Sequence, residues 1–294
     1  MKHPLTFFFS LLYISIVVVV LVVVFLPYLH KKEQAQETLL SPKQLETQPF
    51  VATNTVATLP VVQLVAVGDI MLSRTVGTKI TESDDNALPF RTVAAQLRLA
   101  DITMGNLESP FYDQGPRVSS GMVFKAEPQY IEGLQLAGFD LLTLANNHAM
   151  NQGVAGIEFT NNWLLQHDIK TIGAGKNFEQ AHAGEILERE GTTFGFLGYT
   201  YSGYNDVVGA EHVVVAEMNT AQAKQDIEQL RPLVDVLIIT IHAGTEYVRD
   251  PNWQQIEFAH AAIDAGADLV IGHHAHWPQI IEQYGKGWIF YGLG

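Results

Sequence analysis

The chain has 294 residues and a formal net charge of −14 at pH 7, and it contains no cysteine. The acidic balance argues against a nucleic-acid partner, because the sequence offers no basic stripe to neutralise phosphates. The lack of cysteine excludes disulfides, thiolate metal ligands and cysteine nucleophiles.

An uncharged apolar segment runs from Leu5 to Leu29. As a helix it would be about 37 Å long, which is enough to cross a hydrocarbon core of roughly 30 Å. A cleaved signal peptide is the alternative, but the run is long for one and no small-x-small cleavage site closes it. We therefore predict a short tail over residues 1–4 and a transmembrane anchor over residues 5–29. Lysines flank the segment on both sides, so charge alone does not decide its orientation.

Residues 30–60 are predicted to form a flexible linker. From Glu33 to about Pro60 the chain is rich in Gln, Thr, Ala and Glu and has no glycine or clear period. Such a composition is typical of a tether that holds a globular part away from the bilayer. The remainder, residues 61–294, is long enough for one well-buried domain or two small ones, and we predict a single domain.

This domain alternates between patterns typical of buried strands and of helices, which indicates an α/β fold. Short apolar runs predict strands over residues 61–67, 102–105, 139–145, 170–173, 192–199, 234–241, 268–271 and 288–293. Helical spacing of apolar residues predicts helices over residues 88–99, 130–138, 154–167, 220–230 and 253–265.

Polar side chains follow five of the predicted strands, at the carboxyl ends where α/β folds place their ligands. They are Asp69, Asn106 with Glu108, Asn147 with His148, His242, and His274 with His276. Each one has an ordinary explanation as a helix cap, a solvated loop charge, a turn residue or a packed core histidine. Five in the same structural position favour a metal centre.

Three of the four residues 273–276, which follow the strand predicted over residues 268–271, are histidines. In an extended segment, residues two apart point the same way, so His274 and His276 are expected to aim their imidazoles at one point. Imidazoles with that spacing are good ligands for a divalent metal. His273 is left without a role and is interpreted as a packed or supporting histidine.

Oxygen and imidazole ligands without sulfur suit Mn²⁺, Fe or Zn²⁺ better than Ca²⁺ or a structural zinc. About six ligands exceed what one tetrahedral ion needs, whereas two ions about 3.5–4 Å apart with a bridging carboxylate would use them. Such a pair activates water near neutral pH, and His148 would be free to serve as general acid. The expected chemistry is hydrolysis or transfer at a phosphorus or carbonyl centre.

Five motifs in this order resemble the CapA (PgsA-like) family of capsule and poly-γ-glutamate synthesis proteins, which is similar to the calcineurin-like metallophosphatases. They are GDIML at 68–72, GNLE at 105–108, LANNH at 144–148, HAGTEY at 242–247 and GHHAH at 272–276. The motifs are specific jointly, and the likeness runs from about residue 63 to the end of the chain.

The resemblance implies a four-layer α/β/β/α sandwich with a dinuclear metal site between the sheet edges. By position it implies that one ion is bound by Asp69 and His276, the other by Asn147, His242 and His274, that Glu108 bridges both, and that His148 is the acid. It also implies a single-pass protein of the cell membrane whose domain lies outside the cell. The implied partners are the capsule polymer synthesis machinery and an anionic envelope polymer as substrate.

The sequence departs from the family pattern at several positions. Ala243 stands where tryptophan is usual, Ala275 where proline is usual, and Asn151 where aspartate is common. Trp277 and Pro278 replace aliphatic residues. None of these removes a ligand, but they bear on substrate fit and on the orientation of the ligands. The family's last strand usually continues past the position of the final glycine, so a C-terminal truncation is expected.

Three functions are compatible with these observations. The first is a membrane-anchored dinuclear-metal hydrolase or transferase acting on an envelope polymer. The second is a non-catalytic, polymer-binding partner of a capsule polymerase. The third is a metallophosphatase acting on small phosphoesters.

Overall fold

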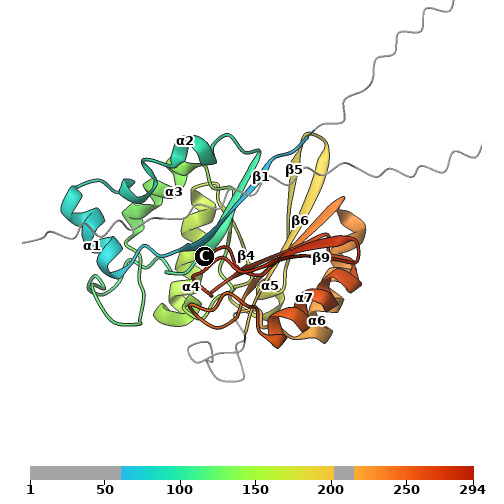
Figure 1. The fold of residues 1–294 in the computed structure, drawn as a ribbon. Helices are drawn as coiled ribbons and strands as arrows, with labels where there is room; N and C mark the ends of the chain where they lie inside the picture. Colours follow the sequence, from blue (N-terminus) through green and yellow to red (C-terminus); the bar gives the residue numbers. More distant parts are fainter. Residues whose placement is uncertain (1–60, 202–214) are drawn as a thin grey trace, which may run out of the picture.

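The computed structural model describes residues 61–201 and 215–294 (Figure 1). The predicted tail, anchor and linker over residues 1–60 lie outside the described residues. Within the described ranges, no helix has both the length and the apolar character that crossing a membrane requires. The domain boundary at residue 61 stays a prediction.

Two β-sheets form the centre of the domain. The first is parallel throughout and has the order β1 (Leu64–Ile70), β2 (Ile102–Leu107), β3 (Leu141–Thr143) and β4 (Lys170–Ile172). In the second, four parallel strands lie between two antiparallel edge strands. Its order is β5 (Glu185–Arg189), β6 (Thr192–Thr200), β7 (Val236–His242), β8 (Leu269–His273), β10 (Gly287–Phe290) and β9 (Ile281–Tyr284).

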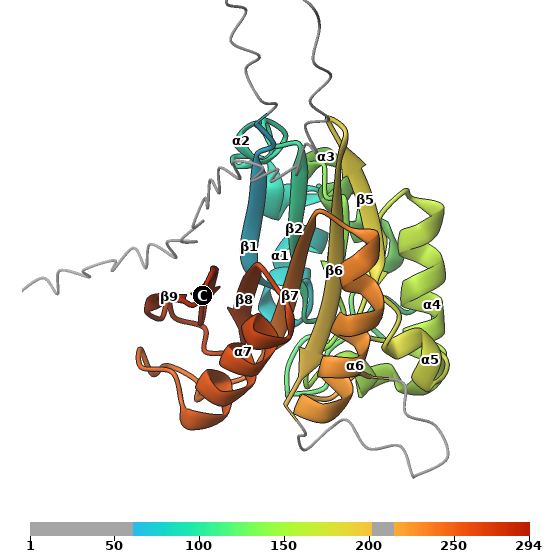
Figure 2. The same cartoon turned by 90° about the vertical axis from the view of Figure 1, so that its right-hand side faces the viewer.

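Helices cover the outer face of each sheet (Figures 1 and 2). The first sheet carries α1 (Arg74–Ser83), α2 (Ala94–Leu97), α3 (Ile131–Ala137) and α4 (Gly153–Gln166), with short 3₁₀ helices η1 (Leu88–Phe90), η2 (Pro128–Tyr130) and η3 (Ala149–Gln152). The second sheet carries α5 (Phe178–Ala181), α6 (Thr220–Leu230), α7 (Trp253–Ala265) and η4 (Arg231–Leu233).

The hydrophobic core is divided into three clusters by this arrangement. The central cluster lies between the sheets, where Met104 and Leu141 from the first sheet meet Phe196 and Ile238 from the second, all fully buried. The other two clusters lie between each sheet and its helices. Because successive side chains of a strand point to opposite faces, each sheet feeds two clusters. The predicted mixed α/β architecture is confirmed, with two sheets.

Several predicted elements match the structure closely. Helices α6 and α7 span the predicted ranges, and α3 ends as expected at Gly138, whose φ of 73° is the left-handed geometry that glycine adopts without strain. Two predictions are wrong. The single helix predicted over residues 88–99 is divided into η1 and α2 by a turn over residues 91–93, where Thr92 and Val93 have a lower helix propensity. The first strand does not stop at Gly68 but runs on to residue 70.

The first strand keeps its pairing with β2 past Gly68 by shifting register between Ala66 and Asp69. A Cβ on Gly68 would lie 1.8 Å from the carbonyl oxygen of Gly294, so the close approach of these two backbones requires glycine. The backbone N–H of Asp69 donates to that same carbonyl at 3.0 Å. The irregularity thus fixes the backbone of Asp69 at the carboxyl end of the strand.

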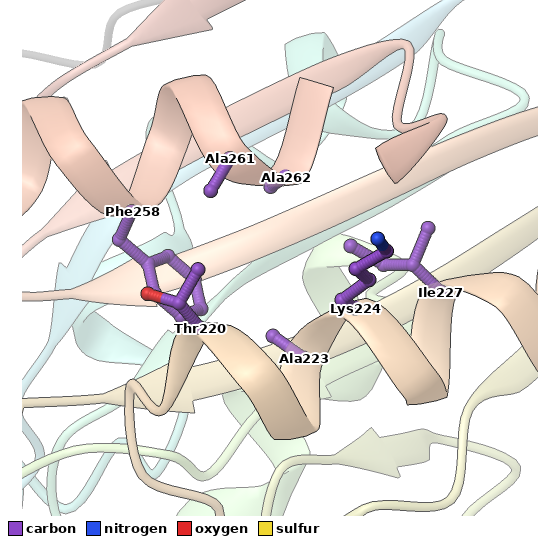
Figure 3. A pocket seen from close by; sticks show the side chains of 7 residues that line it. All are labelled: Thr220, Ala223, Lys224, Ile227, Phe258, Ala261 and Ala262. Carbon is purple, nitrogen blue, oxygen red and sulfur yellow. The ribbon is translucent and has the colours of Figure 1, made fainter. Parts of the chain in front are cut away.

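Helices α6 and α7 lie side by side on the second sheet (Figure 3). A shallow depression between them is lined by Thr220, Ala223, Lys224, Ile227, Phe258, Ala261 and Ala262. Most of this lining is apolar, and none of the predicted site residues is part of it. It is a groove of helix packing, and the polar chemistry of the domain lies at the strand ends.

Candidate metal centre

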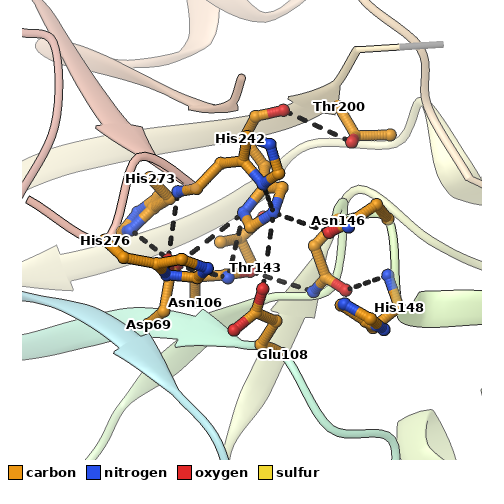
Figure 4. A network of polar contacts seen from close by, with 12 residues as sticks. Asp69, Asn106, Glu108, Thr143, Asn146, His148, Thr200, His242, His273 and His276 are labelled. Carbon is orange, nitrogen blue, oxygen red and sulfur yellow. Dashed lines mark hydrogen bonds and ion pairs between the residues drawn. The ribbon is translucent and has the colours of Figure 1, made fainter. Parts of the chain in front are cut away.

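The structure brings all seven predicted site residues to one edge of the two sheets. Figure 4 shows Asp69, Glu108, His148, His242 and His276 there. Each follows or ends a parallel strand, and parallel strands deliver their carboxyl ends to the same edge. Asp69 lies within the end of β1, Glu108 follows β2, Asn147 and His148 follow β3, His242 ends β7, and His274 and His276 follow β8.

Two groups of donor atoms converge at this edge, and they share one residue. The first group consists of Asp69, Glu108 and His276, and the second of Glu108, His242 and His274. Within each group one ligand atom per residue lies within 4.8 Å of the others. Glu108 is the residue that belongs to both groups.

His242 lies at the centre of the second group and is fully buried. Its Nε2 is 2.9 Å from Asn147 Oδ1, 3.1 Å from His274 Nδ1 and 3.8 Å from Glu108 Oε1. Side chains from several strand ends therefore surround one point. Asn147 contacts this group through its side-chain carbonyl oxygen.

Asp69 organises the first group. Its Oδ2 is 3.1 Å from His276 Nδ1 and accepts a hydrogen bond of 3.0 Å from the backbone N–H of His274. Its Oδ1 accepts from Asn106 Nδ2 at 2.8 Å and lies 3.6 Å from His273 Nδ1. The carboxylate from the first sheet is thus tied to the histidine loop of the second sheet.

The expected extended geometry of the histidine loop is wrong. His274 and His276 have φ angles of 83° and 54°, in the left-handed region that non-glycine residues rarely adopt. The loop is held by a hydrogen bond of 2.8 Å from the Tyr247 N–H to the Ala275 carbonyl. The two imidazoles still approach each other, with ring centroids 6.0 Å apart. They converge through a strained turn and not through the two-residue period of a strand.

The electrostatics of the centre show a shortage of positive charge. Burial, reinforced by the charge of Asp69, raises the pKa of Glu108 to about 8. Burial alone would raise the pKa of Asp69, but the hydrogen bond with His276 and the neighbouring imidazoles hold it well below its usual range. The same hydrogen bond raises the pKa of His276 to about 9. Without metal, Glu108 is therefore mostly protonated at neutral pH and the Asp69 carboxylate is paired with protonated His276, whereas divalent cations would stabilise both carboxylates in their ionised form.

His148 lies beside the two donor groups without joining either. Its backbone N–H donates to Asn146 Oδ1 at 3.0 Å, and its Nδ1 lies 2.9 Å from Asn151 Oδ1. Its ring stacks on Phe124, with centroids 3.8 Å apart and planes inclined by 20°. Burial lowers the pKa of His148, and the Asn151 contact opposes that effect.

Two asparagines that were not assigned as ligands from the sequence support the centre. Asn146 Nδ2 donates to Asn106 Oδ1 at 3.0 Å and to the Leu107 carbonyl at 2.8 Å. Asn106 Nδ2 in turn contacts Asp69 and lies 3.2 Å from His242 Nδ1. Their place at strand ends was visible in the sequence, but their contacts join segments far apart in the chain.

His273 is buried next to Asp69, and neither of its ring nitrogens has a hydrogen-bond partner among the described residues. Its backbone pairs with His242 across β7 and β8. The interpretation as a packed or supporting histidine agrees with this position. A buried imidazole without partners is costly, and its Nδ1 faces the Asp69 carboxylate.

Comparisons with known proteins identify relatives of this chain. Residues 63–294 match the family model described as bacterial capsule synthesis protein PGA_cap. The PGA biosynthesis protein CapA of Bacillus subtilis (strain 168) is 32% identical over 239 residues, which cover 78% of this chain and 61% of the relative. The capsule biosynthesis protein CapA of Bacillus anthracis is 30% identical over 237 residues, covering 78% of this chain and 57% of the relative.

A solved structure shares the fold at low sequence identity. A hypothetical protein from Thermus thermophilus superposes with a TM-score of 0.50 and 17% identity, over 79% of this chain and 75% of that chain. The present chain spans about three fifths of the length of the two curated relatives. The family match covers the whole described domain, including every strand end that builds the centre, so the chain belongs to the bacterial capsule synthesis protein family PGA_cap.

Proposed function

We propose that this chain is a membrane-anchored, dinuclear-metal hydrolase or transferase of capsule and poly-γ-glutamate biosynthesis. The observation that carries the proposal is the position of Glu108, which belongs to both converging donor groups. A carboxylate shared by two sets of imidazole and oxygen donors is the arrangement that bridges two ions. Membership of the family supports the biological setting.

The residues divide into two sets of ligands. Asp69 and His276 would hold one ion, the set formed by Asn147, His242 and His274 would hold the other, and Glu108 would touch both. The donors suit Mn²⁺, Fe or Zn²⁺. When bound, such a pair supplies a nucleophile from water near neutral pH and stabilises negative charge on the attacked group.

His148 would donate a proton to the leaving group. Its Nδ1 is engaged by Asn151 Oδ1, so Nε2 is the nitrogen left to serve the substrate. The stacked ring of Phe124 fixes the plane of the imidazole. A proton delivered from Nε2 to the leaving group would complete cleavage, and a positioned acid of this kind contributes roughly 10²–10⁴-fold in rate.

Metal analysis combined with activity tests the proposal. The full chain, purified in detergent, is expected to carry close to two equivalents of Mn²⁺ or Zn²⁺ and to cleave poly-γ-glutamate or a phosphoester. His242→Ala should lose metal and activity. His260→Ala, which removes a half-buried histidine paired with Glu282 away from the centre, is the matched control. Unchanged metal content and turnover in His242→Ala would refute the proposal.

Two outcomes would favour one of the two alternative functions over the proposed one. Cleavage of p-nitrophenyl phosphate without cleavage of poly-γ-glutamate would indicate a phosphatase of small phosphoesters. Full complementation of a capsule defect by a chain carrying both His148→Ala and His274→Ala would indicate a non-catalytic partner of the capsule polymerase.

We also propose that residues 5–29 anchor the chain in the cell membrane and that the domain lies outside the cell. The apolar run supports the anchor, and the family resemblance supports the orientation. The chain has no cysteine, so a single introduced cysteine gives labelling without background. A membrane-impermeant maleimide should label Lys286→Cys, at an exposed turn, in intact cells, and should label His3→Cys only after lysis. The reverse pattern would overturn the orientation.

A further inference from the structure

A stack of three side chains borders the candidate metal centre on the His148 side. The guanidinium carbon of Arg74 lies 5.3 Å from the centre of the Phe124 ring, and that ring stacks on His148 at 3.8 Å. Phe124 is buried, whereas Arg74 is half-buried. The stack therefore leads from a solvent-accessible cation to the proposed acid.

Arg74 has no carboxylate partner among the described residues. Among residues 61–201 and 215–294 its guanidinium donates only to the Met122 sulfur, at 3.5 Å, and a thioether is a weak acceptor. By contrast, Arg91, Arg189 and Arg231 each pair with an aspartate. The chain has 31 acidic against 17 basic residues, so acidic partners are not scarce. Arg74 lies beside the candidate metal centre without an acidic partner among the described residues, so most of its N–H donors are available to bind another ligand.

The backbone of Arg74 is held in an unfavourable conformation. Its φ is 50°, a left-handed value that costs a residue with a side chain on the order of 1–3 kcal/mol. The surroundings impose it, since the Arg74 N–H donates to the Val118 carbonyl at 3.1 Å and the neighbouring Ser73 Oγ accepts from the Lys125 N–H at 3.1 Å. Strain of this kind is found where the placement of a side chain matters for function.

The charge of Arg74 lies beside the centre, because the Phe124 ring that Arg74 contacts also stacks on His148. Because the chain as a whole is acidic and would repel an anion, a local cation at this place matters.

We propose that the Arg74 guanidinium binds an oxyanion of the substrate at the edge of the metal centre. This inference rests on the proposed function and deepens it. The planar fork of arginine matches two oxygens of a phosphate or carboxylate group, and Phe124 holds that fork in place by stacking. An oxyanion held there lies beside His148, so Arg74 would orient the leaving side of the substrate toward the acid.

Anion binding by the metal-loaded full chain tests this role without relying on turnover. Titration calorimetry uses inorganic phosphate in one arm and γ-glutamyl-glutamate in the other, which separates the two sources of oxyanion. Arg74→Met keeps an apolar stem on Phe124 and removes the donors. We expect it to weaken binding of at least one probe by roughly 10- to 100-fold, as for the loss of a charge-assisted bidentate contact, with metal content unchanged. Arg117→Gln removes an exposed arginine that bonds only to Thr78 and should have no effect.

The outcomes separate failure of this inference from failure of the proposed function. If wild type binds a probe and Arg74→Met binds it equally well, the inference is overturned and the proposed function stands. If the metal-loaded wild type binds neither probe, both the inference and the proposed function are refuted. If thermal melting shows that Arg74→Met is unfolded, Arg74→Lys tests the inference in its place. This variant keeps the positive charge and loses the planar guanidinium group. A several-fold loss in that variant supports the inference, and wild-type affinity refutes it.

Discussion

At the scale of single residues, Glu108 belongs to both donor groups and is buried at an electrostatic cost. Its pKa in the folded protein is raised to about 8 by burial and by Asp69, against 4.5 ordinarily. The folded metal-free protein therefore keeps a proton that the unfolded chain releases. Stability from this group is present at low pH and is lost as pH rises from about 4.5 through about 8.

Replacing Glu108 by glutamine should have opposite effects with and without metal. The amide keeps the shape and removes the buried charge, so at pH 8 the metal-free variant should be more stable than metal-free wild type by on the order of 1–3 kcal/mol. The same variant should bind less metal, because the shared carboxylate is gone. Denaturant unfolding in chelator and metal content per chain measure the two effects. Glu82→Gln, on the exposed face of α1, is the control. A metal-free Glu108→Gln less stable than wild type would contradict the account of buried charge.

Asn151 is the residue that positions the proposed acid. Its Oδ1 lies 2.9 Å from His148 Nδ1 and accepts from the Phe124 N–H at 2.6 Å, so one oxygen orients both members of the stacked pair. Asn151→Ala should lower turnover roughly 10- to 100-fold with metal content unchanged, because the imidazole loses its orientation. Asn151→Asp keeps the acceptor and should retain most activity. Loss of metal in Asn151→Ala, or equal losses in both variants, would assign Asn151 a structural role.

At the scale of elements, the strand ends were predictable and the loops were not. Long apolar runs mark parallel strands buried on both faces, so the polar residue that ends each run, such as Glu108 or His242, could be placed at the sheet edge. Helices α6 and α7 were predictable for a similar reason, since their apolar residues recur with helical period. These signals are local in the sequence.

The loop geometry depends on contacts between distant segments. The left-handed φ angles of His274 and His276 are imposed by neighbours such as Tyr247. The residue types in the loop do not predict these angles. Likewise, the stack of Arg74 on Phe124 joins the start of α1 to a segment 50 residues later. Neither α1 nor this stack was predicted. Sequence reasoning thus found the candidate ligands and missed the side chains that border them.

Close packing of β8 against β10 provides a test at this scale. A Cβ on Gly272 would lie 2.0 Å from the carbonyl oxygen of Tyr291, so the two strands must separate to admit it. Gly272→Ala should destabilise the domain by about 1–3 kcal/mol and weaken metal binding, because the histidine loop follows directly. Gln283→Ala, on the exposed side of β9 in the same sheet, should change neither. Metal binding of wild-type strength in Gly272→Ala would show that the loop is positioned independently of this strand contact.

At the scale of the whole molecule, the centre bridges the two sheets. Asp69, Glu108 and Asn147 come from the first sheet, and the three candidate ligand histidines His242, His274 and His276 come from the second. Away from this edge the sheets are held by an apolar core, which is insensitive to metal. At the edge, the contact of the Asp69 carboxylate with the His274 backbone crosses from one sheet to the other. Ions bound there would add links between the sheets at one end of the sandwich only.

Metal binding should therefore stabilise the domain globally and protect one edge locally. Free metal at 100 times its dissociation constant contributes about 2.7 kcal/mol, which should raise Tm by about 5–10 °C for a domain of this size. Thermal melting of the full chain in chelator and in excess Mn²⁺ or Zn²⁺ measures the shift. Hydrogen exchange should slow most at the carboxyl ends of β1, β2, β7 and β8, with α6 as the internal control, because that helix packs on the far face of the second sheet. A Tm unchanged by metal, or protection no greater at these strand ends than in α6, would show that no ion links the two sheets.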